Sequence, residues 1–247
     1  MDRLKWSLGF SNGVAVDCVG RSGGLALWWR GGVDVSVRPW CRYYIDAKIC
    51  VNNKTWRFSG IYGEPRTELR FKTWEMIRYL RTQDNLPWLC AGDFNEILSQ
   101  DEQKGGNRRG DAQMAAVRDC LSDCGLADLG YKGYDFTWDN KREGDNNIQV
   151  RLDRGTATAP FLEMFPLTYV EHIVTEESDH MALLIRILDE PPRRAAFARG
   201  FMYEEMWTKH DGYEDMIKQA WERGGGMEQG ICGFWKRLRD MSNDMKT

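Results

Sequence analysis

The sequence predicts an α/β domain followed by a helical tail. Two observations favour this fold class. The first sixty residues consist mainly of short runs rich in β-branched and aromatic residues, and segments with helical periodicity alternate with further strand-like runs after them. Because the strands interleave with only a few helices, the pattern favours α/β layers over an all-β barrel. Hydrophobic residues make up 42% of the chain and charged residues 29%, which is typical of a globular protein.

Five strands are predicted in the first part of the chain. Gly-Gly and Arg-Pro pairs separate the runs, and Asn52-Asn53 between the last two predicts a hairpin turn. The predicted strands cover residues 14–18, 24–29, 33–37, 43–51 and 56–61.

Two helices are predicted in the middle of the chain. The first extends from Pro65 to about Arg81, because its apolar residues recur on one side. The second extends from Asp111, as the N-cap, to about Cys124, with Gly125 at the C′ position. A buried strand is predicted at residues 88–91, one or two helical turns at 159–165, and further strands at 136–138, 148–152, 169–174 and 181–188.

The composition changes after the last of these strands. Pro191-Pro192 and Arg193-Arg194 are typical of a linker. Beyond them, apolar residues recur at helical spacing on both sides of a Gly-Gly-Gly segment, which predicts two amphipathic helices. We therefore predict a domain at residues 1–188, a linker at 189–200 and an amphipathic helical tail at 201–247, which packs on the domain or on a protein partner.

The charge balance excludes a globally basic nucleic-acid binder. The net charge is −3, so a polyanionic substrate has to meet local basic patches and a metal ion. Candidate patches are residues 104–109, Lys141-Arg142, and Arg151 with Arg154, although a solvated loop explains each of them at least as well.

The sequence favours an intracellular protein. Its start has no apolar segment of signal-peptide type, and its longest apolar run, residues 25–29, is too short to span a bilayer. The seven cysteines are scattered without a Cys-x-x-Cys pair, which indicates a reducing compartment.

Two short motifs carry groups suited to hydrolysis. In Gly92-Asp93-Phe94-Asn95, the carboxylate and the amide fall on the same side if the segment is extended, where they can hold a water molecule and the phosphoryl oxygen that it approaches. Ser178-Asp179-His180 precedes an apolar strand and supplies a metal-binding carboxylate and an imidazole. Taken alone, the first motif is more often a turn and the second more often a polar loop.

These motifs belong to a longer ordered series. The series reads Ser-Gly-Gly-Leu-Ala from residue 22, Ile-Tyr-Gly from 61, Gly-Asp-Phe-Asn from 92, Gly-Tyr-Asp-Phe-Thr-Trp from 133, Arg-Leu-Asp-Arg from 151 and Ser-Asp-His from 178. It resembles the endonuclease/exonuclease/phosphatase superfamily, and most closely the endonuclease domain of plant LINE-type (non-LTR) retrotransposon polyproteins. The resemblance covers roughly residues 8–188 and is specific because six motifs keep their order.

The resemblance implies a fold, an activity and a cofactor. The fold is a four-layer α/β sandwich, with two mixed β-sheets packed face to face and helices outside. The activity is Mg²⁺- or Mn²⁺-dependent hydrolysis of phosphodiesters, with one strand of chromosomal DNA as the target and a nuclear location. A phosphodiester needs charge neutralisation by a hard cation and an in-line water, which agrees with these implications.

The resemblance also implies roles for six residues. Asp93 positions or activates the attacking water, and Asn95 steadies the transition state. His180 contacts the scissile phosphate and Asp153 orients it. Asp179 is a metal ligand, and Tyr62 contacts the phosphate or the leaving group. Residues 136–138 lie near the DNA-facing rim in the family, although core packing is the favoured interpretation of their aromatic side chains.

The chain departs from the family pattern at its start. An Asn-bearing first strand and a metal-binding Glu precede the first motif in the family, and here only Asp2 and Asp17 are acidic before Ser22. We therefore expect the first strands of the sandwich to be missing, metal affinity to be weakened and nuclease activity to be poor.

Three functions follow from these patterns. The leading one is a retrotransposon endonuclease, and the alternative is a catalytically silent remnant that binds or packs through its tail helices. A relative acting on phosphoinositides or small phosphoesters is disfavoured by the flanks of the motifs at residues 22 and 151.

Overall fold

The computed structural model describes residues 2–19, 22–175, 178–190 and Lys218. The chain divides into two compact units, Met1–Pro192 and Arg193–Thr247. The predicted tail helices and most of the predicted linker lie outside the described residues, so they stay predictions. Among the described helices, none is long and apolar enough to cross a membrane.

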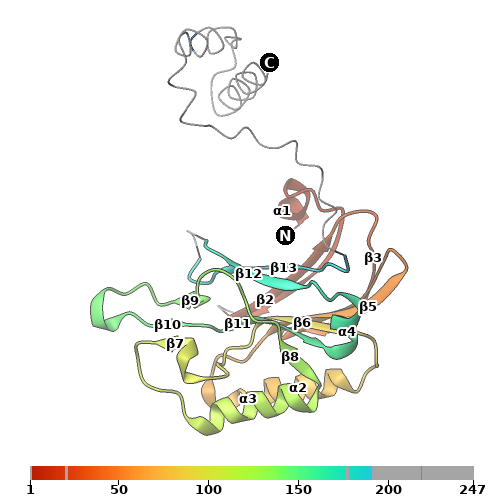
Figure 1. Ribbon diagram of the computed structural model, residues 1–247. Coiled ribbons are helices and arrows are strands. Elements are labelled where there is room, and N and C mark those ends of the chain that lie inside the picture. Colours follow the sequence, from red (N-terminus) through yellow and green to blue (C-terminus); the bar gives the residue numbers. More distant parts are fainter. Residues whose placement is uncertain (1, 20–21, 176–177, 191–217, 219–247) are drawn as a thin grey trace, which may run out of the picture. The chain divides into compact units, whose positions relative to one another are not determined.

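A six-stranded mixed sheet forms the centre of the first unit (Figure 1). Its order is β3-β4-β5-β6-β11-β8, in which β5 and β6 are parallel and all other neighbours antiparallel. The strands are β3 (Asp34–Cys41), β4 (Tyr44–Val51), β5 (Lys54–Tyr62), β6 (Trp88–Asp93), β11 (Asp153–Thr158) and β8 (Leu126–Asp128). Asn52 and Asn53 form the predicted hairpin turn, with φ of 51° and 60°.

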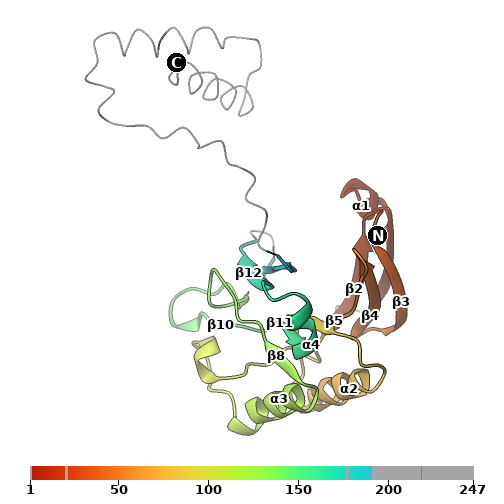
Figure 2. The ribbon, with the colours of Figure 1, turned by 45° about the vertical axis from the view of Figure 1, so that its right-hand side comes forward.

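Two helices cover one face of this sheet, α2 (Phe71–Arg81) and α3 (Asp111–Asp123) (Figures 1 and 2). Their apolar sides supply Trp74, Ile77 and Val117 to a buried core against the sheet. The first helix begins later than predicted, because residues Thr67–Leu69 form a separate 3₁₀ turn. The N-cap of α3 is Gly110, so Asp111 lies in the first turn, where its charge favours the helix dipole.

Two antiparallel hairpins lie against the main sheet. Strand β2 contacts β4 and β5, and β13 contacts β11. Around Trp56, Ala157 and Phe161, a second core packs with residues of β13 and of the short helix α4. The elements are α1 (Asp2–Ser7), β1 (Asn12–Val19), β2 (Ser22–Trp29), α4 (Ala159–Met164), β12 (Tyr169–Ile173) and β13 (Ala182–Arg186).

This arrangement confirms the predicted α/β sandwich, with packed sheets and few helices. Within the described residues, the two hairpins are separate two-stranded sheets in place of a second continuous sheet. A third small sheet carries part of the site and has the order β7-β10-β9. Its strands are β7 (Gln103–Lys104), β10 (Gln149–Val150) and β9 (Trp138–Asp139). Strand β10 is shorter than predicted, β9 is displaced toward the C-terminus, and β7 was not predicted.

Gly92 in β6 is a position that only glycine fits. Its φ is +137°, and an added Cβ would lie 2.1 Å from the carbonyl oxygen of Ile61 on the neighbouring strand. We expect Gly92→Ala to lower the free energy of unfolding by more than about 2 kcal/mol, measured by urea denaturation. The strain of a positive φ and the clash with the backbone of Ile61 both contribute to this loss.

The matched control is Gly125→Ala. Gly125 also has a positive φ of +64°, but an added Cβ meets nothing within 4 Å. Its replacement should cost only about 1 kcal/mol, the penalty of the left-handed conformation. Equal losses for the two variants would contradict the close approach at Gly92.

Candidate active site

Three site residues predicted from the sequence lie side by side at one edge of the main sheet. In strand register, Tyr62 is paired with Asp93, and Asp93 with Asp153. Strand β6 is parallel to β5 and antiparallel to β11, so the ends of β5 and β6 meet the beginning of β11. The sequence interpretation places Asp153 after the strand at 148–152; in the structure that strand ends at Val150, and Asp153 opens the next strand, β11.

Asn95 holds the carboxylate of Asp93 in place. Its backbone N–H donates to Asp93 Oδ1 over 2.8 Å, and its side-chain amide donates to Asp93 Oδ2 over 2.7 Å and to the carbonyl of Gly63 over 2.9 Å. The φ of Asn95 is 56°, so the two side chains meet through a turn and not along an extended segment as predicted. In this geometry, Asn95 positions Asp93.

The environment of Asp93 favours its protonated form. Burial and then the nearby carboxylate of Asp153 raise the pKa of Asp93 to about 7, against the opposing effects of His180 and of the Asn95 hydrogen bonds. A carboxylate with a pKa near neutrality accepts a proton more readily than an ordinary aspartate. Asp93 is therefore suited to take a proton from water.

Asp153 orients His180. The Nδ1 atom of His180 lies 2.8 Å from Asp153 Oδ2, which leaves Nε2 as the ring atom that can meet a substrate. The backbone of Asp153 is held as well, because its N–H donates to Thr137 Oγ1 over 2.9 Å. Burial disfavours the imidazolium, but Asp153 and then Asp93 and Asp179 outweigh burial and raise the pKa of His180 above its ordinary value.

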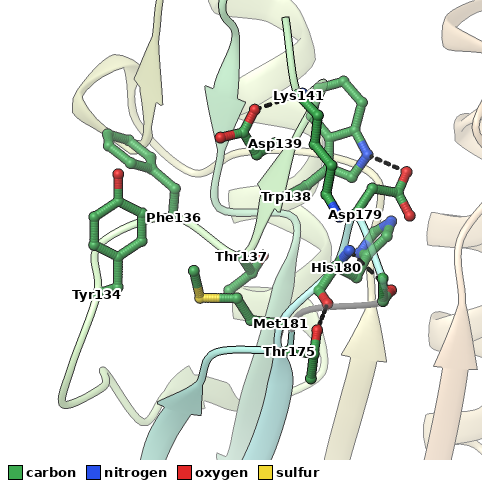
Figure 3. A pocket seen from close by; sticks show the side chains of 11 residues that line it. Tyr134, Phe136, Thr137, Trp138, Asp139, Lys141, Thr175, Asp179, His180 and Met181 are labelled. Atoms are coloured by element: carbon green, nitrogen blue, oxygen red, sulfur yellow. Dashed lines mark hydrogen bonds between the residues drawn. The ribbon is translucent and has the colours of Figure 1, made fainter.

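Asp179 lies at a cavity beside this pair. The cavity has a volume of about 160 Å³ and is lined by residues from the segment around β9 and from the segment before β13 (Figure 3). Trp138 Nε1 donates to Asp179 Oδ2 over 3.0 Å. Phe136 and Trp138 are half-buried and line the cavity, so core packing explains these aromatic side chains only in part. Trp138 also packs on the core formed by Ile97, Met114, Val150 and Leu152.

The oxygen donors here suit a hard cation that keeps most of its water. Among the described residues, no group of three or more His, Cys, Asp or Glu could hold a metal ion. Mg²⁺ is commonly bound by one or two carboxylates together with substrate phosphates, so a preformed cage is not required. Asp179, which accepts a hydrogen bond from Trp138 at Oδ2, is the carboxylate that would hold such an ion.

A buried network of charged side chains beside the site was not predicted from the sequence. Arg151 donates to Glu102 over 2.6 Å and to Asp128 over 2.8 Å, and Arg154 donates to the same two carboxylates over 2.9 and 2.8 Å. Both arginines are buried, so they are not the phosphate patch considered above. They flank Asp153 and fix the start of β11. Their acidic partners lie 23 to 52 residues away, and spacing gives no signal for such pairs.

The structure has the α/β sandwich fold of the endonuclease/exonuclease/phosphatase proteins. It is similar to the endonuclease domain of TRAS1, a telomere-specific non-LTR retrotransposon, with a TM-score of 0.59, 20% identity, and coverage of 72% of this chain and 81% of that one. It is also similar to the 3′-5′ exonuclease NExo from Neisseria meningitidis, with a TM-score of 0.53, 16% identity, and coverage of 75% and 82%.

A third similar structure is the AP endonuclease LMAP from Leishmania major. Its TM-score is 0.55 and its identity 12%, with coverage of 77% of this chain and 75% of that one. No protein-family model matches the sequence, and no curated protein does so. The likeness to solved structures therefore defines the fold, and the function has to be argued from the site.

Proposed function

We propose that this chain is a divalent-metal-dependent DNA endonuclease that nicks one strand, of the kind carried by plant non-LTR retrotransposons. The observation that carries the proposal is the pairing of Asp93 with the Asp153–His180 pair across neighbouring strands. Asp93 is a carboxylate with a pKa near neutrality, and His180 is an imidazole with a raised pKa. Asp93 can accept a proton from the attacking water while His180 carries a positive charge, as hydrolysis of a phosphodiester requires.

The chain's own residues divide the reaction into two sides. On the water side, Asn95 orients Asp93, which accepts a proton from the attacking water. On the phosphate side, Asp153 holds His180 so that its protonated ring donates to an oxygen of the scissile phosphate. Tyr62, in register with Asp93, contacts the phosphate or the leaving group. A Mg²⁺ or Mn²⁺ ion held by Asp179 would neutralise the negative charge that develops on the phosphoryl oxygens.

Several further properties follow as part of the same proposal. DNA is the partner, and a nuclear location follows because the target is chromosomal. The similar fold of a retrotransposon endonuclease domain, of an exonuclease and of an AP endonuclease supports a nucleic-acid substrate. A silent remnant has no need for a carboxylate held by two donor groups beside an oriented histidine, so this alternative is not favoured.

Plasmid nicking by the full chain tests the proposal. In line with the poor activity expected from the sequence, we expect slow Mg²⁺-dependent conversion of supercoiled to open-circular DNA, which is lost in EDTA. The rate should be lower by about 100-fold or more in His180→Gln, the usual range for a lost acid–base group. The control is His172→Gln, because the ring of His172, on β12, binds the carbonyl of Tyr134 in the loop before β9, and the glutamine amide can replace that bond. Nicking that persists in EDTA, or in His180→Gln, would sink the proposal.

A further inference from the structure

The loop after β5 holds a buried carboxylate that fixes an exposed arginine. Glu64 is 2% exposed, whereas the side chain of Arg66 is 59% exposed. Arg66 Nε donates to Glu64 Oε1 over 2.7 Å, and Arg66 Nη2 donates to Glu64 Oε2 over 3.2 Å. The hydroxyl of Tyr43 donates to the same Oε2 over 3.0 Å. The guanidinium is therefore held in one orientation, while its remaining N–H donors lie outside the pair.

Glu64 carries a full negative charge at neutral pH. The hydrogen bonds from Arg66 are the main reason that the pKa of Glu64 is lowered to about 2. Most exposed arginine–carboxylate pairs are weak because two flexible side chains must be ordered. Here the carboxylate is already fixed by burial and by Tyr43, so only the arginine has to be ordered. The pair is built to orient Arg66.

The short chain connection through Gly63 places Arg66 near the candidate active site. Gly63, three residues before Arg66, donates its N–H to the carbonyl of Asp93 over 2.6 Å and accepts from the amide of Asn95 over 2.9 Å. Three residues of chain span at most about 11 Å. Since phosphates follow one another every 3.4 Å or so along the axis of a DNA strand, Arg66 lies within a few nucleotides of a scissile phosphate bound by His180 beside Asp93.

A second arginine adds to the positive charge at this edge. The guanidinium of Arg42 lies 4.6 Å from the ring centre of Tyr43, the residue that also contacts Glu64. Arg42 therefore contacts Tyr43 directly, and Arg66 is linked to Tyr43 through Glu64. In a chain with a net charge of −3, such a local excess of positive charge is what a polyanion would meet.

We propose that Arg66, oriented by Glu64, binds a backbone phosphate of the DNA strand that flanks the scissile phosphate. The inference rests on the proposed function and adds a contact that positions the strand without reading its sequence. Bidentate recognition is open to an arginine and not to a lysine, because the guanidinium presents paired donors in a fixed plane.

Salt-dependent DNA binding tests this contact. Binding of the full chain to a fluorescent duplex oligonucleotide is measured by anisotropy in EDTA, which removes cleavage, at several NaCl concentrations. Arg66→Gln should weaken binding and reduce the slope of log K against log[NaCl] by about 1, the contribution of one phosphate contact. Arg66→Lys should keep the slope, because it keeps the charge, while still binding more weakly than the unaltered chain.

The control is Arg78→Gln. Arg78 is also an exposed arginine paired with a carboxylate, Asp123, over 2.8 Å, but it lies near the end of α2, which begins after the loop that carries Arg66 and leads away from it. Its replacement should leave the slope unchanged. An unchanged slope in Arg66→Gln, with or without a lower melting temperature, would overturn the inference and leave the nuclease proposal intact. Absence of salt-dependent binding by the unaltered chain would overturn both.

Discussion

Asp93→Asn is expected to abolish nicking and, at the same time, to remove a pH dependence from the stability of the fold. The amide cannot accept a proton from water, so the nicking rate should fall by at least about 100-fold. The NH₂ group of the amide cannot accept a hydrogen bond, whereas both oxygens of the carboxylate do. One of the two hydrogen bonds from Asn95 is therefore lost, at a cost of about 1 kcal/mol. The measurements are plasmid nicking and urea unfolding as a function of pH.

The sign of the pH effect follows from the raised pKa. Asp93 has a pKa of about 7 in the folded chain against an ordinary value of 3.8, so the folded state holds the proton more tightly. This stabilisation is full below about pH 4 and is lost as the pH rises through 7. Asparagine has no such dependence. Between pH 4 and pH 8, the free energy of unfolding of the unaltered chain should therefore fall, relative to that of Asp93→Asn, by on the order of 2–4 kcal/mol.

Asp139→Asn provides a contrast of opposite sign. Hydrogen bonds from Gln149 and from the backbone of Lys141 lower the pKa of Asp139, so its stabilising effect is present at neutral pH and is lost as the pH falls through that lowered value. The variant should therefore lose stability relative to the unaltered chain as the pH rises from 3. If Asp93→Asn shows the same direction as Asp139→Asn, the assigned environment of Asp93 is wrong.

Arg154→Met should cause the largest loss of stability among the substitutions considered. The side chain of Arg154 is fully buried and donates to Glu102, to Asp128 and to the carbonyls of Glu96 and Arg151. Methionine fills much of the same volume but leaves two buried carboxylates with one arginine. Removing one partner from a buried ionic network typically costs about 3–5 kcal/mol.

The surface pair Arg78–Asp123 gives the matched control. It has the same 2.8 Å separation, but both side chains are exposed, at 40% and 57%. Arg78→Met should therefore cost at most about 1 kcal/mol in urea unfolding. Adding Glu102→Gln to Arg154→Met should restore part of the loss, because it removes one of the unpaired charges. Similar losses for the two arginines would show that the buried network is not the source of stability.

Much of the fold was predictable because the relevant signals are local. Strand-like runs rich in β-branched and aromatic residues flank Asn52-Asn53, and a left-handed turn favours asparagine, so the hairpin could be located. Gly125 has the left-handed conformation expected of a C′ residue. In contrast, β11 was missed. All six of its residues are buried, because β11 lies between two strands and also contacts α4 and β13, so its residues show no alternation of the kind that predicts a strand.

The candidate site was predictable only as a set of residues. The order of short motifs named Tyr62, Asp93, Asn95, Asp153, Asp179 and His180, and the structure brings Tyr62, Asp93 and Asp153 into one strand register with His180 bonded to Asp153. Their individual roles remain proposals. Arg66 was not predicted, because its distinguishing feature is the burial of its partner and not a sequence pattern.

The sequence by itself determined the α/β class, the main turns and the identity of the polar residues at the strand ends, since these depend on neighbours along the chain. The tertiary structure alone decided which carboxylates are near one another, which arginines are buried and which remain exposed. Strand register and burial set those properties, and both depend on residues far apart in sequence. For this reason Arg154 became a core residue, Arg66 an oriented surface cation and Asp93 a carboxylate with a raised pKa.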